Sequence, residues 1–316
     1  MTIKSFTKSK RSHAFTSANH PIRRIRRLKE FAIGTILFIC AAISVLATIG
    51  IVYILVRESI PFFEHVSVSE FLTGTEWTPL FSDAKFGILP LITGTLMVTF
   101  IALLVAIPLG TVVATYLSEY VSNTAKEIIK PILELLAAVP TVVYGYFALF
   151  FVTPLLQKIF QNISGFNVLS AGIVIGIMII PYVSSLAEDA MRSVPQYLRE
   201  GSYALGASRL QTAFKVIYPA AFSGITSAYI LGISRALGET MVVAIAAGMQ
   251  PQLTFNPLES AETITAFIVQ VSLGDLPHGS IGYQSIYVAG LTLLVMTLIF
   301  NIIGFWLKRK FREVVL

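Results

Sequence analysis

Apolar runs of about 20 residues recur along the chain, and the segments between them carry most of its charge. A helix of that length crosses the hydrocarbon core of a bilayer. A large soluble core is the alternative, but it does not require uninterrupted runs this long. The pattern therefore predicts six membrane-spanning helices, at about residues 31–56, 88–118, 132–156, 168–187, 222–249 and 284–307.

Three prolines, Pro108, Pro140 and Pro181, lie inside these apolar runs. A proline frees a backbone carbonyl and can kink a membrane helix where helices move against one another. Kinks that serve only packing are the alternative.

The composition agrees with a membrane protein. Of the 316 residues, 55% are hydrophobic and 13% are charged, whereas a soluble domain has roughly 25% charged residues. The single cysteine, Cys40, lies in an apolar run, so the chain has no disulfide framework and no cysteine-based metal site. We expect an all-α membrane protein with a basic tail at residues 1–30 and a transmembrane domain at 31–316.

The basic tail resembles the start of a signal peptide. The apolar run that follows it is too long for a signal peptide and shows no clear cleavage site, so we expect an uncleaved anchor. A transit peptide is the remaining alternative for a start rich in Arg and Ser.

The net charge of +6 could indicate nucleic-acid binding, but the distribution of the charge favours another cause. If the N-terminus is inside, nearly all Lys and Arg residues fall in inner segments. Those that do not are Arg57, Lys85 and Lys158 in outer loops and Arg235 within a span. The positive-inside rule then predicts that both termini are cytoplasmic. Contact with anionic membrane lipid accounts for the basic excess, and no nucleic-acid partner is required.

Two long loops would then face the outside, at about residues 57–87 and 250–283. The first is acidic and the second lacks Lys and Arg. We expect a soluble partner to dock there, although both loops could simply connect spans.

The inner loop between the fourth and fifth spans reads SVPQYLREGSYALGASRLQTAFKVIYPAA. It predicts two short helices. Pro195 suits a first helical turn, Gly206 suits the position after a helix end, and Ser208 with Gln211 forms a capping box. Pro219 would end the second helix. An amphipathic helix at this place could press into a groove on a cytoplasmic partner.

This loop resembles the inner-loop signature of the binding-protein-dependent permeases of bacterial ABC importers. That signature is Glu-Ala-Ala, three residues, Gly, nine residues, Ile, one residue and Leu-Pro. The chain matches it in register at Glu200, Gly206, Val216 and Pro219, and departs from it at Gly201, Ser202 and Tyr218.

In that family the loop is a coupling helix that sits in the cleft of a separate ATPase subunit. The resemblance therefore implies the fold of a type I ABC importer permease, with a family core at about residues 88–310. It assigns the ATPase contact to Glu200, Tyr203, Ala204, Leu205 and Gly206. An ordinary amphipathic connector is the alternative.

Several further blocks are similar to the PstC-type permeases of bacterial phosphate importers. They are FLTGTEW at 71–77, FGILPLITGTL at 86–96, AIPLGTVVATYLSEY at 106–120, LAAVPTVVYGYFAL at 136–149, SRALGETMVVAIAAG at 234–248 and TAFIVQVSLGD at 265–275. The resemblance implies a bacterial inner-membrane location. The implied partners are a PstA-type sister permease, a PstB-type ATPase dimer that binds ATP and Mg, and a periplasmic PstS-type phosphate-binding protein.

Arg235 lies near the centre of the predicted fifth span. A central Arg costs about 2.5–3.5 kcal/mol on insertion scales and by default marks a functional site. Glu239 is four residues further on, so on a continuous helix the two side chains can pair. An incoming phosphate would compete with Glu239 for the guanidinium, and Thr240 could add a hydroxyl. The family resemblance likewise places Arg235 and Glu239 on the phosphate path. A structural ion pair is the alternative.

The sequence contains no Gly-x-x-x-x-Gly-Lys-Ser/Thr loop and no catalytic constellation. We expect a transport subunit rather than an enzyme, with no cofactor of its own and with ATP hydrolysis on a partner chain. A permease for another oxyanion, such as molybdate, sulfate or phosphonate, remains open. A secondary transporter or channel, and a non-transporting scaffold or sensor, are the alternatives from other classes.

Overall fold

A computed structural model describes residues 21–312 except Ser82, Asp275 and His278. The described chain is almost entirely helical, with one isolated bridge between Trp77 and Phe86. The helices are α1 Pro21–His65, α2 Val68–Thr73, α3 Leu89–Glu119, α4 Asn123–Ala138, α5 Thr141–Phe147, η1 Ala148–Val152, α6 Thr153–Gln157, α7 Val168–Arg192, α8 Gln196–Ala204, α9 Arg209–Thr212, η2 Ala213–Ile217, α10 Tyr218–Ala220, α11 Phe222–Leu237, α12 Met241–Ala246, α13 Ile264–Ser272 and α14 Ile281–Arg312.

The chain divides into two compact units, Met1–Tyr53 and Ile54–Leu316. The described part of the first unit is the beginning of α1, and the second unit contains the end of α1 and all later helices. Most of the predicted basic tail, residues 1–20, lies outside the described residues.

Four of the six predicted spans are confirmed as continuous helices. They are Leu28–His65 within α1, α3, α7 and Ile281–Lys310 within α14, and each is long and apolar enough to cross a membrane. The described chain could cross six times if each of two bent helix pairs counts as one span. The all-α class of the membrane protein is therefore confirmed.

The predicted third span at 132–156 is broken by a sharp bend. α4 and the helical segment from Thr141 to Gln157 meet at a bend of 86°. Pro140 explains the break, because a proline disfavours the helical conformation in the residue before it. Val139 is accordingly extended, with φ −62° and ψ 129°.

The predicted fifth span at 222–249 is also broken. α11 stops at Leu237, three residues without helical structure follow, and α12 then begins at Met241. At its other end α11 meets the helical segment Arg209–Ala220 at a bend of 77°.

Each of the two π-helical segments, η1 and η2, directly precedes a helix with proline in its first turn. A widened turn at this place relieves the clash between the proline ring and the preceding turn of helix.

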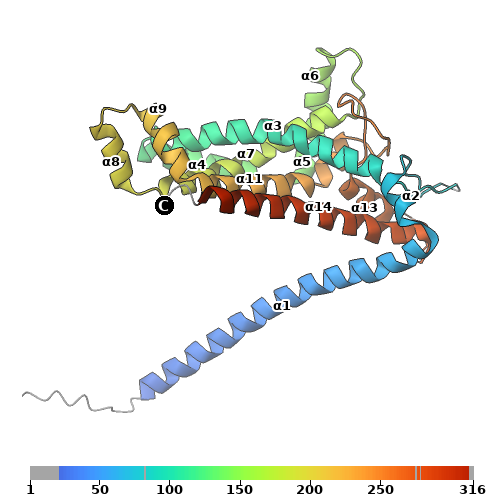
Figure 1. Ribbon diagram of the computed structural model, residues 1–316, viewed down its shortest axis with the longest axis horizontal. Coiled ribbons are helices and arrows are strands. Elements are labelled where there is room, and N and C mark those ends of the chain that lie inside the picture. The colour runs from blue at the N-terminus through green and yellow to red at the C-terminus, as the bar shows by residue number, and fades with distance from the viewer. Residues whose placement is uncertain (1–20, 82, 275, 278, 313–316) are drawn as a thin grey trace, which may run out of the picture. The chain divides into compact units, whose positions relative to one another are not determined.

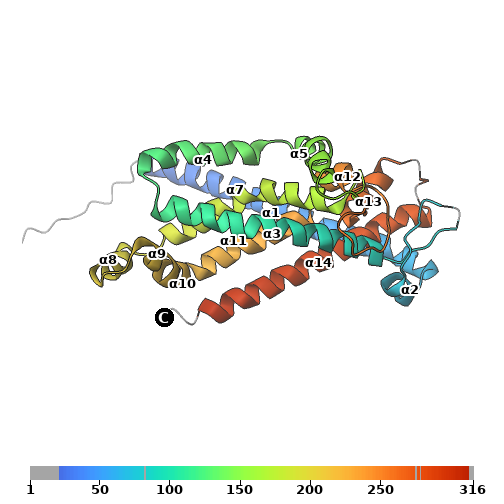
Figure 2. The same ribbon diagram turned by 90° about the horizontal axis from the view of Figure 1, so that it is seen from above.

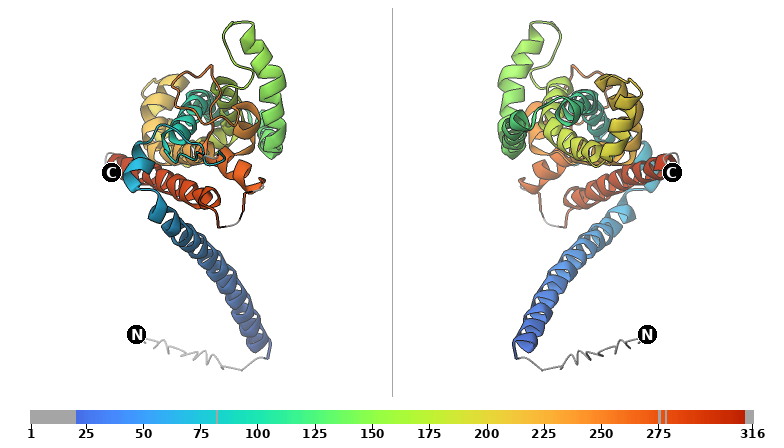
Figure 3. Two further views of the ribbon diagram at one scale, coloured as in Figure 1. Left: turned by 90° about the vertical axis from the view of Figure 1, so that its right-hand side faces the viewer. Right: turned by 90° about the vertical axis from the view of Figure 1, so that its left-hand side faces the viewer.

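α3 and α7 form the centre of the second unit. The end-on views in Figure 3 show its other helices gathered around this pair. Gly172 and Gly176 on α7 allow the close approach, since a Cβ atom at either would lie within 2.7 Å of Ile101 or Val105 side-chain atoms. Most of the buried α7 side chains belong to one apolar core with residues of α3, α5 and α12.

The two ends of this unit differ in chemistry. α8, α9 and the end of α14 lie at one end, while α2 and α13 lie at the other (Figures 1 and 2). At the α2 end the two loops predicted to face outside pack together. Phe62, Phe71, Trp77, Phe86 and Phe267 form an edge-to-face aromatic cluster, in which the Trp77 and Phe267 ring centroids are 5.0 Å apart. The two loops therefore have a packed aromatic core of their own. Docking of a partner on them stays a prediction.

Candidate functional site

Arg235 lies in the last turn of α11, 13 residues from its start and thus roughly 20 Å along the helix. Its guanidinium carbon lies 3.9 Å from the centroid of the Tyr182 ring on α7. Its Nε atom is buried and has no hydrogen-bond partner among the described residues. Within the same residues the guanidinium makes no ion pair. The cation therefore rests against an aromatic ring, and its N–H groups have no hydrogen-bond acceptor among these residues.

The predicted Arg235–Glu239 ion pair is wrong for the described structure. The prediction assumed a continuous helix, but α11 ends at Leu237 and the four-residue spacing no longer aligns the two side chains. Glu239 is buried, with 8% of its surface exposed, and a carboxylate oxygen accepts a 3.4 Å hydrogen bond from the Val242 amide at the start of α12. Glu239 therefore caps the next helix.

Thr240 lies in the same break between α11 and α12. Its hydroxyl donates to the Gly238 carbonyl at 3.2 Å. The backbone carbonyl of Glu239 accepts a 2.7 Å bond from the buried Thr265 hydroxyl, which ties the break to α13. Arg235, Glu239 and Thr240 are thus close in sequence and share no direct bond in the described structure.

Tyr182 was not identified from the sequence. Its hydroxyl donates to the Ala137 carbonyl at 3.1 Å, one turn before the bend that ends α4. A cavity of about 320 Å³ adjoins it, lined by residues of α3, α4, α7 and α11. No sequence signal marks this contact, because a tyrosine in an apolar run reads as ordinary core.

The loop between α7 and α11 folds as predicted at Gly206 and at the capping box, whereas Pro195 directly precedes α8 and is not in its first turn. Gly206 follows the end of α8 with φ +82°, the left-handed conformation that favours glycine. Ser208 and Gln211 make both bonds of the capping box, at 2.9 and 3.3 Å. The predicted end of the second helix at Pro219 is close to the observed end at Ala220.

The predicted coupling residues lie on an exposed surface. α8 has no buried residue, and Glu200, Tyr203 and Ala204 are all exposed. Leu205 is 91% exposed, which is unusual for leucine and leaves an apolar side chain available to a partner. A shallow groove beside it is lined by residues of α8, α9, η2 and the turn between α8 and α9.

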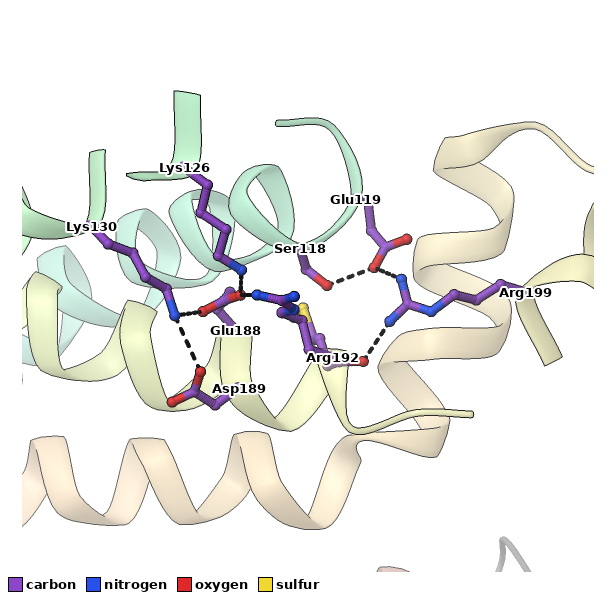
Figure 4. A network of polar contacts seen from close by, with 9 residues as sticks. Ser118, Glu119, Lys126, Lys130, Glu188, Asp189, Arg192 and Arg199 are labelled. Carbon is purple, nitrogen blue, oxygen red and sulfur yellow. Dashed lines mark hydrogen bonds and ion pairs between the residues drawn. The ribbon is translucent and has the colours of Figure 1, made fainter. Parts of the chain in front are cut away.

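Arg199 anchors this exposed helix to the bundle, as Figure 4 shows. Its guanidinium donates to Glu119 at the end of α3 at 2.6 Å and to the Met191 carbonyl near the end of α7 at 2.7 Å. The Glu119 side chain is 2% exposed and also accepts a 2.6 Å bond from Ser118. Sequence reasoning missed this clamp because its two charged residues are 80 positions apart.

A second ionic cluster joins α4 to α7 nearby (Figure 4). Glu188 is fully buried and pairs with Lys126, with Lys130 at 2.6 Å and with Arg192 at 3.7 Å. Lys130 also contacts Asp189 at 3.3 Å. These pairs fix the start of α4 against the end of α7, beside the Arg199 clamp.

Glu262, between α12 and α13, is a buried acid that the sequence analysis did not single out. It is 1% exposed, and its Oε1 atom has no hydrogen-bond partner among the described residues. Burial raises the pKa of this carboxyl to about 8. Its neutral form is therefore the favoured one near neutral pH.

Comparison with known proteins identifies the family. The pattern described as "Binding-protein-dependent transport system inner membrane component" matches residues 106–313. The chain belongs to this family of ABC transporter permeases. The family is one of transport subunits, and its members are multi-pass membrane proteins.

Three similar proteins are described as permeases. The chain is 38% identical over 290 residues to "Probable ABC transporter permease protein YqgH" of Bacillus subtilis, covering 91% of this chain and 94% of that one. It is 34% identical to "Phosphate transport system permease protein PstC" of Mesorhizobium japonicum, covering 76% and 78%. It is 30% identical to "Probable phosphate transport system permease protein PstC" of Methanocaldococcus jannaschii, covering 92% and 96%.

Solved structures share the fold at low sequence identity. A chain of a bacterial alginate ABC transporter, in complex with a pentasaccharide-bound periplasmic protein, aligns with a TM-score of 0.60 and 17% identity, covering 92% of this chain and 96% of that one. A chain of the inward-facing MetNI methionine ABC transporter aligns with a TM-score of 0.53 and 16% identity, covering 71% and 94%. The fold is that of an ABC importer permease.

Proposed function

We propose that this chain is the permease subunit of an ATP-driven phosphate importer and forms half of the phosphate path. The observation that carries the proposal is the Arg235 guanidinium, which is partly buried in an apolar bundle and has no carboxylate partner among the described residues. A guanidinium fork matches the oxygens of a tetrahedral oxyanion. Similarity to several PstC proteins favours phosphate as that oxyanion.

Glu239 and Thr240 complete the proposed path at the break between α11 and α12. Breaks in membrane helices are tolerated where the freed backbone lines a cavity or is buried in protein, and such breaks often border transport sites. In this proposal Glu239 shapes the break by capping α12, and the substrate meets Arg235 without first displacing Glu239.

α8 is the proposed coupling helix. Its exposed residues Glu200, Tyr203, Ala204, Leu205 and Gly206 would enter the cleft of a PstB-type ATPase subunit, which carries ATP and Mg. The Arg199 clamp gives such a contact a rigid connection to α3 and α7. A PstA-type sister permease and a periplasmic PstS-type phosphate-binding protein complete the proposed complex.

The proposed location is the bacterial inner membrane, with both termini in the cytoplasm. Support comes from the basic residues in the segments at the α8 end of the bundle, where α8, α9 and the end of α14 lie (Figure 1). These basic residues are Lys126, Lys130, Arg192, Arg199, Arg209, Lys215, Lys308 and Lys310. Such an excess favours the cytoplasmic side of a membrane.

Phosphate uptake in phosphate-starved cells tests the proposal. Cells that lack the gene are compared with cells in which it is restored, with arsenate, sulfate and molybdate as competitors. Restored uptake that arsenate alone inhibits supports a phosphate permease. If the restored gene supports uptake of sulfate or molybdate instead of phosphate, that anion becomes the assigned substrate. If it restores uptake of none of these oxyanions, the proposal is overturned.

A further inference from the structure

The contact between Tyr182 and Arg235 joins three helices at the proposed substrate site. The tyrosine is on α7, the arginine on α11, and the tyrosine hydroxyl is bonded to the Ala137 carbonyl on α4. Fixing the ring at its hydroxyl fixes the plane on which the guanidinium rests. The bond also lies one turn before the 86° bend between α4 and α5.

The way in which Tyr182 touches Arg235 leaves the arginine able to bind an anion. The guanidinium carbon lies over the ring, 3.9 Å from its centroid. This separation is too short for an N–H group to fit between them, so we take the planar cation to stack on the ring by a face. The N–H donors lie at the edge of that plane and point away from a stacked ring. A carboxylate partner would occupy that edge and would have to be displaced by the substrate.

We propose that Tyr182 is the positioning residue of the anion site, holding the Arg235 guanidinium by its face so that its edge is presented to an incoming oxyanion. This inference rests on the proposed function, because it takes Arg235 to contact the transported anion. A pre-oriented side chain loses less freedom on binding, so Tyr182 lowers the KM for phosphate without contacting it. The turnover of the assembled complex depends on Tyr182 much less.

Substitutions at Tyr182 separate the ring from the hydroxyl. Tyr182→Leu removes both, and we expect it to raise the KM for phosphate about three- to thirtyfold, the range of a partly buried cation–π contact. Tyr182→Phe keeps the ring and should raise the KM less. The maximal uptake rate per assembled complex should stay within about twofold of the wild-type rate in both variants.

Tyr144 provides a matched control. It lies on α5, and its hydroxyl donates to the Leu136 carbonyl at 2.8 Å, next to the carbonyl that Tyr182 uses. Its ring makes no cation–π contact with Arg235. Tyr144→Phe should therefore leave the KM at the wild-type value, although it removes an equivalent hydrogen bond at the same helix end.

A shape-conserving series guards against loss of packing in Tyr182→Leu. Phenylalanines with increasing numbers of fluorine atoms, introduced at position 182, keep the ring but weaken its attraction for a cation. We expect the KM to rise step by step with fluorination. The inference is overturned if the KM does not change across this series, or if Tyr182→Leu has the wild-type KM. Loss of uptake in Arg235→Ala under the same conditions would show that the role of Arg235 still stands. If the wild-type complex transports no phosphate, the proposed function fails instead.

Discussion

Arg199 on α8 and Glu119 at the end of α3 form a nearly buried ion pair at 2.6 Å, which fastens an otherwise exposed helix to the bundle. Removing one partner of a buried pair leaves an uncompensated charge and typically costs about 3–5 kcal/mol. In Arg199→Ala we expect ATP hydrolysis by the complex to continue while phosphate uptake falls at least tenfold, because α8 no longer moves with α3 and α7. Parallel assays of hydrolysis and uptake in reconstituted complexes measure this.

Arg209→Ala is the matched control for that experiment. Arg209 is exposed on α9 and forms no ion pair within the described chain. Its removal should preserve the phosphate moved per ATP hydrolysed. An unchanged ratio in Arg199→Ala would show that the clamp does not transmit motion.

Two glycines near α8 should respond in opposite ways to the same substitution. Gly206 has φ +82°, where an L-residue is strained, so Gly206→Ala should destabilise the loop by about 1–2 kcal/mol. Gly201 lies within α8 with open space around its Cα, so Gly201→Ala should stabilise the helix by up to about 1 kcal/mol. Thermal unfolding of the purified complex measures both effects, and shifts of the same sign would contradict this description of α8.

Glu262 predicts a pH dependence of stability. Its folded-state pKa of about 8 lies above its ordinary value of 4.5, so the folded chain keeps a proton that the unfolded chain releases between these pH values. The free energy of unfolding should therefore fall as pH rises from about 4.5 to 8, by at most about 1.4 kcal/mol per pH unit. Glu262→Gln should lessen this fall, as measured by melting temperatures across the window.

Glu259→Gln is the control for the pH experiment. Hydrogen bonds from Thr254 and Asn256 lower the pKa of the half-buried Glu259 carboxyl, so its stabilising effect is lost only in more acidic solution. Its variant should keep the wild-type slope between pH 5 and pH 8. A Glu262→Gln variant with that same slope would mean that Glu262 is ionised in the folded protein.

Glu239 should tolerate loss of charge better than loss of its oxygen. Gln at this position still offers an acceptor to the Val242 amide, so Glu239→Gln should keep uptake within about threefold of wild type. Glu239→Ala removes the cap, at a cost of about 1 kcal/mol, and should reduce uptake further. If Glu239→Gln abolished uptake as Arg235→Ala is expected to do, the charge of Glu239 would itself be required.

Signals that act over a few residues were readable from the sequence. The capping box of Ser208 and Gln211 and the left-handed Gly206 follow from local backbone chemistry, and both are present. The spans at α3 and α7 follow from unbroken apolar runs. The prolines were less informative, because α3 and α7 continue through Pro108 and Pro181 while α4 ends before Pro140.

The site itself depended on tertiary structure. The expected Arg235–Glu239 pair required helical geometry through Gly238, and the helix ends one residue before it. The contacts that Arg235 and Arg199 make instead, with Tyr182 and Glu119, link residues 53 and 80 positions apart in the sequence. These two contacts are set by the packing of α7 against α3, α4 and α11. A local sequence pattern does not predict that packing.

The central claim is that the Arg235 guanidinium binds the transported phosphate, and uptake by arginine variants tests it most directly. Arg235→Ala and Arg235→Lys complexes are purified, checked for assembly, reconstituted and assayed for phosphate uptake beside wild type. We predict no measurable uptake in Arg235→Ala and a loss of at least tenfold in Arg235→Lys, because an ammonium does not reproduce the planar fork. Wild-type uptake in an assembled Arg235→Ala complex would contradict the account.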